Sequence, residues 1–400
     1  MKERSLKFLF NPAILILIIS CIFIQCNLSN PQTKLEKIKT QLIKKDDIFA
    51  GRFPEYTEDG EWIFSGKPNW FAGFTGGELW YMYEMTGDET MKTRAIKHAD
   101  QLIPLATLDD THDMGFIFLP TCVKTFQISK DEKYRQAGIR AAGMLAKRFN
   151  KKGKFIRAWG KLGTPAREGL MLIDTMMNLE LLFWAAEETG NREFYEIAKT
   201  HAITAMNEIV RVNGSSYHVI EWDPQTGDLI NKRTHQGYKD ESTWARGQAW
   251  GIYGFANTYQ RTRDKRFLDT SIKMADYFLS FLPEDFVPYW DLDLVGEDVL
   301  RDASAGAIAA SGMFLLAELV ETEELKEKYL DYAVKITVSL MENYLFTESI
   351  RETEDGILLH CIYNFNKNRA VDESYPAGDF YFIEAVRKLW DTNKLLVGQL

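Results

Sequence analysis

Two aspartates sit in apolar surroundings that suit acid–base chemistry. Asp174 lies in the apolar run 169–179, which is predicted to be helical, and Asp113 lies in Thr111–Phe116 just before another apolar stretch. A buried carboxylate without a full counter-charge has a raised pKa, which makes it usable as a general acid near neutral pH. Paired carboxylates of this kind are typical of glycoside chemistry. The alternative for each aspartate alone is a helix cap or an arginine partner, because structural ion pairs also shift pKa values.

A third cluster combines an arginine with tryptophan in the segment 243–251. Arg246 and Trp250 are four residues apart, so we expect them to share one face of a helix. A guanidinium fork beside an indole ring suits a carboxylated sugar, since the fork binds the carboxylate and the ring stacks on the sugar. The preceding segment 232–237 supplies further hydrogen-bond donors. An arginine–tryptophan stack without any ligand is the alternative.

Several function classes are excluded by what the sequence lacks. The formal net charge is −9, with 57 acidic and 48 basic residues and no basic run, so nucleic acid is not an expected partner. The six histidines form no metal-binding spacing, and there is no serine-hydrolase elbow or phosphate loop. His112, beside Asp113, and His218, in an alternating segment, are the histidines that we expect near a site.

The elements that position these residues are predicted to be helical hairpins. Short turns near residues 87, 130, 190, 263 and 322 each separate two helical patterns. We expect an Asp or Asn to cap each second helix, and Gly at the preceding position to end the first helix in a left-handed conformation. The long returns between hairpins, including a strand-like segment 216–222, favour a closed ring of hairpins with functional residues at one end. The chain from residue 27 to 400 is predicted to be one all-α domain.

The N-terminus has the pattern of a secretory signal over residues 1–26. Basic residues precede the apolar segment 13–24, which is too short to cross a bilayer. Cysteine at the junction, either Cys21 or Cys26, indicates a bacterial lipoprotein signal. We therefore expect export to the periplasm or cell envelope and a lipid anchor in a membrane. Cys122 and Cys361 are predicted to be buried thiols rather than a disulfide.

These motifs together resemble the unsaturated glucuronyl hydrolases of glycoside hydrolase family 88. The resemblance is carried by Thr-His-Asp-Met-Gly-Phe around Asp113, the Asp174 segment, Tyr217-His218, His235-Gln236, Trp-Ala-Arg-Gly-Gln-Ala-Trp and the late segment 375–382, in the same order over residues 35–390. It implies an (α/α)6 barrel with no metal and no cofactor. It assigns the general acid/base role to Asp174 and a second essential carboxylate to Asp113. By position it assigns substrate binding to His112, Trp159, His218, Thr234, Gln236, Arg246 and Trp250.

The resemblance also implies a substrate class. Members of the family remove the 4,5-unsaturated uronic acid that polysaccharide lyases leave at the non-reducing end of oligosaccharides, by hydrating the C4=C5 double bond. Members that act on sulfated glycosaminoglycans tend to carry serines before a lysine in a late loop, whereas this chain has Asn364-Phe365-Asn366-Lys367. We therefore expect ulvan oligosaccharides, supplied by an upstream lyase. The alternatives are glycosaminoglycan products, an unsaturated rhamnogalacturonyl hydrolase, and a non-catalytic sugar-binding lipoprotein.

Overall fold

The computed structural model describes residues 31–347 and 354–397. The predicted signal peptide, with Cys21 and Cys26, lies outside the described residues. Among the helices of the described part, none has both the length and the apolar character needed to span a membrane. Cys122 and Cys361 are free and buried, so the prediction of two buried thiols is confirmed.

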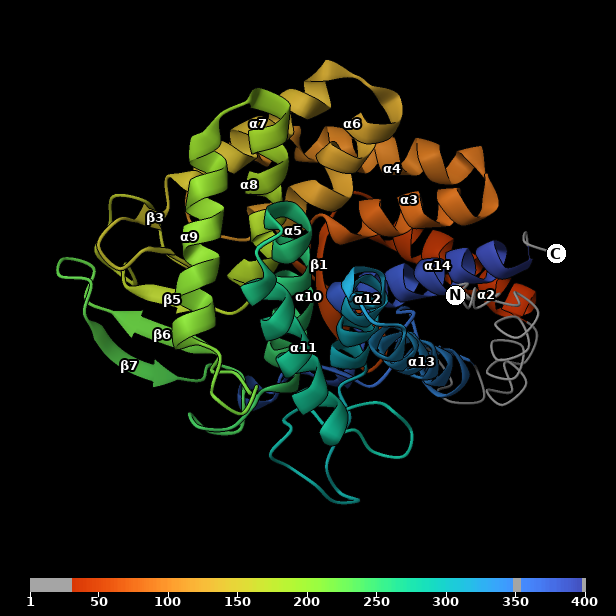
Figure 1. The fold of residues 1–400 in the computed structure, drawn as a ribbon. Helices are drawn as coiled ribbons and strands as arrows, with labels where there is room; N and C mark the ends of the chain where they lie inside the picture. The colour runs from red at the N-terminus through yellow and green to blue at the C-terminus, as the bar shows by residue number, and fades with distance from the viewer. Residues whose placement is uncertain (1–30, 348–353, 398–400) are drawn as a thin grey trace, which may run out of the picture.

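In the described part of the chain, six inner helices form a closed ring in which each packs against the next (Figure 1). They are α3 (Phe74–Thr86), α5 (Met114–Phe118), α8 (Thr175–Thr189), α10 (Ala245–Thr262), α12 (Ala303–Leu319) and α14 (Pro376–Val397). The second of these continues past Pro120 through a π-helical turn, η2 (Leu119–Val123), into α6 (Lys124–Ser129). Proline has no N–H to donate, so it changes the hydrogen-bond pattern of the helix at this point.

Six outer helices alternate with the inner ones along the chain. They are α2 (Pro31–Phe49), α4 (Glu89–Leu102), α7 (Glu132–Ala146), α9 (Arg192–Glu208), α11 (Lys265–Ser280) and α13 (Glu323–Ser339). The fold is therefore an (α/α)6 barrel, and the predicted fold class is confirmed. Because each outer helix runs back along its inner neighbour, all the inner helices begin at the same end of the barrel.

The short turns within the hairpins have the predicted caps. Side chains at the start of five outer helices accept a hydrogen bond from a backbone N–H in the first helical turn, and these are Asp88, Asp131, Asn191, Asp264 and Thr322. Left-handed glycines end the preceding helices at Gly87 and Gly190, as predicted, whereas Lys130 and Arg263 take the same conformation without being glycine. The fifth turn differs, because the cap is a threonine and the residue that ends α12, Val320, is extended.

The barrel interior is filled by inner helices that are buried on nearly every face. All residues of α12 from Ala303 to Ala317 are buried, and most of them are Ala, Gly or Ser. Small residues let neighbouring helices approach closely. A Cβ added at Gly312, for example, would lie 2.9 Å from the side chain of Tyr253 on α10.

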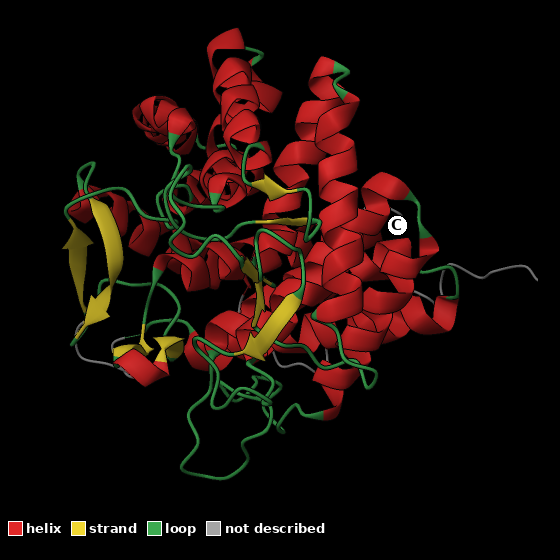
Figure 2. Ribbon diagram, turned by 90° about the vertical axis from the view of Figure 1, so that its left-hand side faces the viewer, coloured by secondary structure: helices red, strands yellow, loops and turns green. Residues whose placement is uncertain are grey.

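Short strands on the long returns cover the end where the inner helices begin (Figure 2). The largest sheet is antiparallel and contains β5 (Leu170–Leu172), β6 (Val219–Trp222) and β7 (Leu229–Arg233). Three two-stranded ladders accompany it: β1 (Phe53–Glu58) with β2 (Glu61–Ser65), β3 (Phe149–Asn150) with β4 (Phe155–Ile156), and β8 (Cys361–Asn364) with β9 (Arg369–Glu373). Three short turns complete the elements: η1 (Ile103–Thr107), η3 (Leu340–Tyr344) and η4 (Phe365–Lys367).

The expectation that Asp174 lies within a helix is wrong. Residues Leu170–Leu172 form strand β5, and α8 begins only at Thr175. An apolar run of this length is compatible with either a buried strand or a buried helix. Residues 170–172 form a strand because they pair with β6 in an antiparallel ladder. Asp174 therefore occupies the position immediately before the first turn of α8.

A fully buried ion triad holds the N-terminal helix against the barrel. The Lys45 ammonium on α2 lies 2.5 Å from a carboxylate oxygen of Glu78 on α3 and 2.9 Å from one of Asp379 on α14. All three side chains are 0% exposed. Burial raises the pKa of Glu78 to about 7, against the opposing effect of Lys45. The cation thus compensates the two carboxylates inside the protein.

Candidate active site

The predicted site residues gather at the end of the barrel where the inner helices begin. Asp113 directly precedes α5, Asp174 directly precedes α8, and Arg246 lies in the first turn of α10. A cavity of about 110 Å³ is lined there by six of the nine predicted residues: His112, Asp113, Trp159, Asp174, Gln236 and Arg246. The N-terminal ends of helices carry partial positive charge, so this end of the ring attracts anions.

Asp174 has the electrostatic setting of a general acid. Burial, and then the nearby charge of Asp113, raise the pKa of Asp174 to about 7, while Arg246 acts in the opposite direction. Its Oδ2 atom is buried without a hydrogen-bond partner among the described residues. The Nε2 atom of His218 lies 3.6 Å away from this oxygen. Both the protonated and the ionised form are thus accessible near neutral pH.

Asp113 is held by hydrogen bonds from its own segment. The Thr111 hydroxyl donates to Asp113 Oδ2 at 2.6 Å, and His112 Nε2 lies 3.3 Å from Asp113 Oδ1. The other ring nitrogen of His112 is 2.7 Å from the Thr175 hydroxyl. Burial lowers the pKa of His112, so its ring is neutral and carries one proton. With that proton on Nε2 toward Asp113, Nδ1 accepts from Thr175, which links Asp113 to the start of α8.

A side-chain amide fixes the spacing between the two catalytic candidates. The Phe116 backbone N–H donates to Asn178 Oδ1 at 2.9 Å, and Asn178 Nδ2 donates to the Asp174 carbonyl at 3.3 Å. Gly115 permits this close approach, since a Cβ there would lie 2.6 Å from the Asn178 Cα. The helices that follow Asp113 and Asp174 are therefore locked side by side.

Arg246 lines the cavity but also holds a neighbouring strand. Its guanidinium donates to the carbonyls of Ile362 and Tyr363 on β8, and Nη1 is 3.3 Å from Asp302 Oδ2. The guanidinium carbon lies 4.3 Å from the ring centroid of Trp244. Arg246 is thus positioned on several sides, with its cationic group at the wall of the cavity.

His218, Thr234 and Gln236 form one connected unit behind the cavity. The His218 Nδ1 atom accepts from the backbone N–H groups of His235 and Gln236, both at 3.3 Å, and lies 3.5 Å from the Thr234 hydroxyl. Its ring stacks on Trp244 at 4.3 Å. Burial lowers the pKa of His218 well below its usual value, so the ring is neutral, with its proton on Nε2 facing Asp174. Of the three, only Gln236 lines the cavity.

The structure does not place Trp250 at the cavity, in contrast to the expectation. The side chain is 0% exposed and packs between Phe116 and Tyr381, at 5.1 Å from each ring. One helical turn separates it from Arg246, and that turn carries it deeper into the barrel. Trp244, the residue that precedes α10, is instead the nearest of the rings around Arg246, at 4.3 Å, with Tyr375 at 5.5 Å and Tyr363 at 5.8 Å.

Several residues that line the cavity have no site role among those predicted from the sequence. Trp70 and Arg369 line the cavity, as do His235, Tyr363 and Lys367. Trp70 Nε1 lies 3.4 Å from the Tyr363 hydroxyl, which joins returns that are far apart in the chain. Neither Trp70 nor Arg369 belongs to a motif with recognisable spacing. The only sequence signal for either is that Trp70 lies just before an inner helix. Among the described residues, no three His, Cys, Asp or Glu side chains are grouped to hold a metal ion.

A larger cleft of about 940 Å³ continues outward from the cavity. The two share Trp159, His235, Tyr363 and Lys367. Lys161, Arg167 and Arg233 add cationic groups to the outer cleft, with Arg233 lying 3.5 Å from Glu221. Lys367 Nζ is 3.2 Å from His235 Nε2. The arrangement offers an enclosed inner pocket next to an open, cation-bearing outer one.

Relatives of known activity share both the sequence and the fold. A model of Glycosyl Hydrolase Family 88 matches residues 46–345. The unsaturated chondroitin disaccharide hydrolase of Streptococcus pneumoniae is 37% identical over 89% of this chain and 91% of its own length. The unsaturated glucuronyl hydrolase of a Bacillus species is 35% identical over 85% of this chain and 92% of its own length.

Solved structures agree with these matches. The crystal structure of the Bacillus unsaturated glucuronyl hydrolase matches with a TM-score of 0.84 and 32% identity, over 90% of this chain and 97% of that one. An Asp→Asn mutant of the Streptococcus agalactiae enzyme, complexed with dGlcA-GalNAc6S, matches with a TM-score of 0.79 and 31% identity, over 98% of both chains. The chain therefore belongs to glycosyl hydrolase family 88, the family of the unsaturated glucuronyl hydrolases, and is a glycosidase.

Proposed function

We propose that this protein removes the 4,5-unsaturated uronic acid from the non-reducing end of lyase-generated oligosaccharides by hydrating the C4=C5 bond. The observation that carries the proposal is Asp174, a largely buried acid with a pKa of about 7 beside Asp113, on the wall of a pocket at the positive ends of the inner helices. A non-catalytic sugar-binding protein would gain nothing from a carboxyl group in this setting.

The proposed reaction uses Asp174 first as an acid and then as a base. Asp174 donates its proton to C4 of the vinyl ether, and a water molecule adds at C5 as its own proton passes to the carboxylate. The resulting hemiketal opens and releases the neighbouring sugar. Asp113 supports this cycle because its charge helps to keep Asp174 protonated before the reaction.

The other site residues would bind or position the substrate. Arg246 and the helix N-termini provide a positive environment for the uronate carboxylate. Trp159 offers a ring face where the inner pocket meets the outer cleft. His112 and Gln236 also line the inner pocket, whereas His218 and Thr234 would act by holding the segment 234–236 in place.

The outer cleft supports a sulfated sugar as the neighbour of the uronate. Its four cationic side chains, Lys161, Arg167, Arg233 and Lys367, outnumber its three carboxylates, Asp110, Glu168 and Glu221, and suit a sulfate group. Two sulfated lyase products are candidate substrates. The names of the relatives and the dGlcA-GalNAc6S complex favour chondroitin disaccharides. The late loop Asn364–Lys367, which has no serine before its lysine, favours ulvan-derived Δ-uronyl-rhamnose-3-sulfate.

A panel of lyase digests tests both the proposed reaction and the proposed preference for sulfated substrates. The assay follows loss of absorbance at the unsaturated uronate band, with sulfated and unsulfated chondroitin disaccharides, heparin disaccharides and ulvan digests as substrates. We expect turnover of short sulfated products and none of intact polysaccharide. Faster turnover of unsulfated than of sulfated disaccharides would contradict the sulfate assignment, and no turnover of any digest would contradict the reaction itself.

A further inference from the structure

Two buried arginines, Arg148 and Arg157, lie next to the segment that carries Trp159. They are 2% and 4% exposed. Arg148 lies two residues after the end of α7, and Arg157 directly follows β4. Neither lines the inner pocket or the outer cleft, so neither would touch the substrate. Any role of these arginines in the reaction must therefore act through other residues.

Every backbone carbonyl from Arg157 to Gly160 accepts a hydrogen bond from one of the two guanidiniums. Arg148 Nε donates to the Arg157 carbonyl at 2.8 Å, and Arg148 Nη2 donates to the carbonyls of Ala158 and Gly160 at 3.0 and 3.1 Å. Arg157 Nε donates to the Trp159 carbonyl at 2.8 Å. A guanidinium offers several donors in fixed directions, so the two together fix the backbone of this segment.

Arg148 also ties this segment to the one that precedes Asp113. Its Nη1 atom donates to the Asp109 carbonyl at 2.9 Å. The backbone N–H of His112 donates at 2.9 Å to the Ala158 carbonyl, which is the oxygen that Arg148 Nη2 also reaches. The guanidinium thus bridges the two segments where they meet at the wall of the inner pocket.

The two guanidiniums occupy their positions at an electrostatic cost. Neither Arg148 nor Arg157 forms an ion pair with a carboxylate in the part of the chain that the structure describes. Burial lowers the pKa of both groups, yet both stay charged near neutral pH. A buried cation without a counter-charge destabilises a fold. Neutral donors could hold a loop at lower cost, so the two cations indicate that the position of this segment matters.

The side chain that this arrangement controls is that of Trp159. The half-buried ring lies on the wall that the inner pocket and the outer cleft share. It packs against a small apolar cluster separate from the main core, formed by Ala158, Leu170, Leu172 and Val219. The His235 ring lies against it in T-shaped geometry, with 5.1 Å between centroids. Because the main core does not enclose the ring, its position depends on the backbone of its own segment.

We propose that Arg148 and Arg157 are positioning residues that hold the ring of Trp159 where the sugar next to the unsaturated uronate stacks on it. This inference rests on the proposed function, in which Trp159 offers a ring face where the inner pocket meets the outer cleft. The two arginines act mainly on substrate binding, because the ring must face the sugar before the reaction begins. Their loss should therefore raise KM more than it lowers kcat.

A double-mutant cycle with Trp159 tests the proposal. Kinetics are measured with dGlcA-GalNAc6S or with Δ-uronyl-rhamnose-3-sulfate, whichever the wild type cleaves faster. We expect Arg148→Lys, which keeps the charge but loses the planar fork, to raise KM by about tenfold and to lower kcat by less than about threefold. In a Trp159→Ala background the same change should raise KM by less than about twofold, because the ring is already absent. Arg157→Lys should behave in the same way, and it tests the proposal even where Arg148→Lys does not fold.

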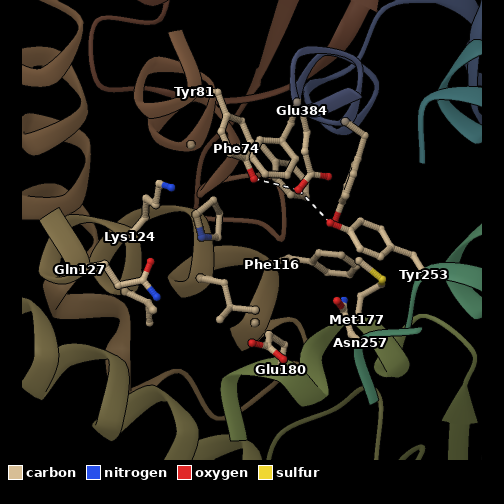
Figure 3. Close-up of a pocket in the computed structure, with 17 residues that line it drawn as sticks. Phe74, Tyr81, Phe116, Lys124, Gln127, Met177, Glu180, Tyr253, Asn257 and Glu384 are labelled. Carbon is tan, nitrogen blue, oxygen red and sulfur yellow. Dashed lines mark hydrogen bonds between the residues drawn. The ribbon is translucent and has the colours of Figure 1, made fainter. Parts of the chain in front are cut away.

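Arg261→Lys is the matched control. Arg261 also has a partly buried guanidinium, and it pairs with Glu180. Glu180 lines a separate cavity of about 270 Å³ that shares no lining residue with the inner pocket or the outer cleft (Figure 3). This variant loses the same fork far from Trp159, so it should keep the KM of the wild type.

Two outcomes would overturn the proposal while leaving the proposed function in place. One is that Arg148→Lys and Arg157→Lys keep the KM of the wild type, whatever happens to kcat. The other is that each raises KM by the same factor with and without the Trp159 ring, as independent residues do. A wild type that cleaves no digest would instead contradict the proposed function, and the inference would fall with it.

Discussion

The protonation state of Asp174 reflects two opposing influences. A carboxylate just before a helix is favoured in its charged form by the positive end of the helix. Arg246 acts in the same direction, yet burial and the charge of Asp113 outweigh both and raise the pKa to about 7. The positive end of α8 thus partly offsets the rise in pKa that burial causes. Asp174 can therefore lose and regain its proton during one turnover.

Asp174→Asn should abolish most turnover while leaving the fold intact. Removing the proton donor is expected to lower kcat by about 100- to 10,000-fold. The variant and the wild type are compared by absorbance decay of a digest that the wild type cleaves, with Asp269→Asn, an exposed outer-helix change, as the control. Turnover of Asp174→Asn within a few fold of the wild type would remove Asp174 from the mechanism.

The raised pKa of Asp174 predicts that kcat/KM falls at alkaline pH. The proposed reaction begins from protonated Asp174, so kcat/KM should be highest below pH about 7 and fall as pH rises through the pKa of this group. The measurement is kcat/KM between pH 5 and pH 9 on one disaccharide. A rate that rises through neutral pH would show that the ionised form starts the reaction.

At the level of elements, the contact between α5 and α8 sets the geometry of the site. Gly115→Ala would place a Cβ 2.6 Å from the Asn178 Cα, so the two helices must separate. We expect a drop in kcat/KM of about tenfold or more, since small displacements of catalytic groups are costly. The control is Gly143→Ala on α7, where a Cβ meets no atom within 4 Å. Equal activity of the two variants would mean that this contact does not position the carboxylates.

The buried triad links α2, α3 and α14. We expect the stability of the protein to depend most on its cation, Lys45. Lys45→Met leaves Glu78 and Asp379 buried without their counter-charge. We expect the free energy of unfolding to fall by about 3–5 kcal/mol. Chemical denaturation measures it, with Lys44→Met as the control, because Lys44 is half exposed and pairs with Asp355 at 2.9 Å. A loss no larger than that of the control would show that the carboxylates are neutral in the folded protein.

At the level of the whole molecule, the ring directs six helix N-termini toward one end. This common direction follows from the alternation of inner and outer helices, and it places the catalytic candidates, Arg246 and the cationic outer cleft on the same side.

Export with lipid attachment is a prediction for the full chain. The segment 1–26 should be processed in a bacterial host, and a fatty acid should be attached at Cys21 or Cys26. Metabolic labelling with an alkyne fatty acid, in the wild type and in the Cys21→Ser and Cys26→Ser variants, identifies the residue. We expect one variant to lose the label and to leave the membrane fraction. An unlabelled wild type in the cytoplasmic fraction would contradict the prediction.

Local sequence determined the turns and helices of this protein, because their signals act over a few residues. Asp88, Asp131, Asn191 and Asp264 cap helices in the structure as the sequence predicts. The motifs around Asp113, Asp174 and Arg246 likewise identified residues that the fold brings to one cavity. Such motifs are readable because a few neighbouring residue types carry the chemistry.

Tertiary structure alone decided which side chains face the cavity and which support it. Sheet pairing turned the segment before Asp174 into a strand, and one helical turn placed Trp250 in the core rather than at the cavity. Trp70 and Arg369 reach the site from returns that lie far apart in the chain. Burial and charge pairing depend on atoms from distant segments. The pKa of Asp174 is raised only when those segments come together and exclude water from its carboxyl group.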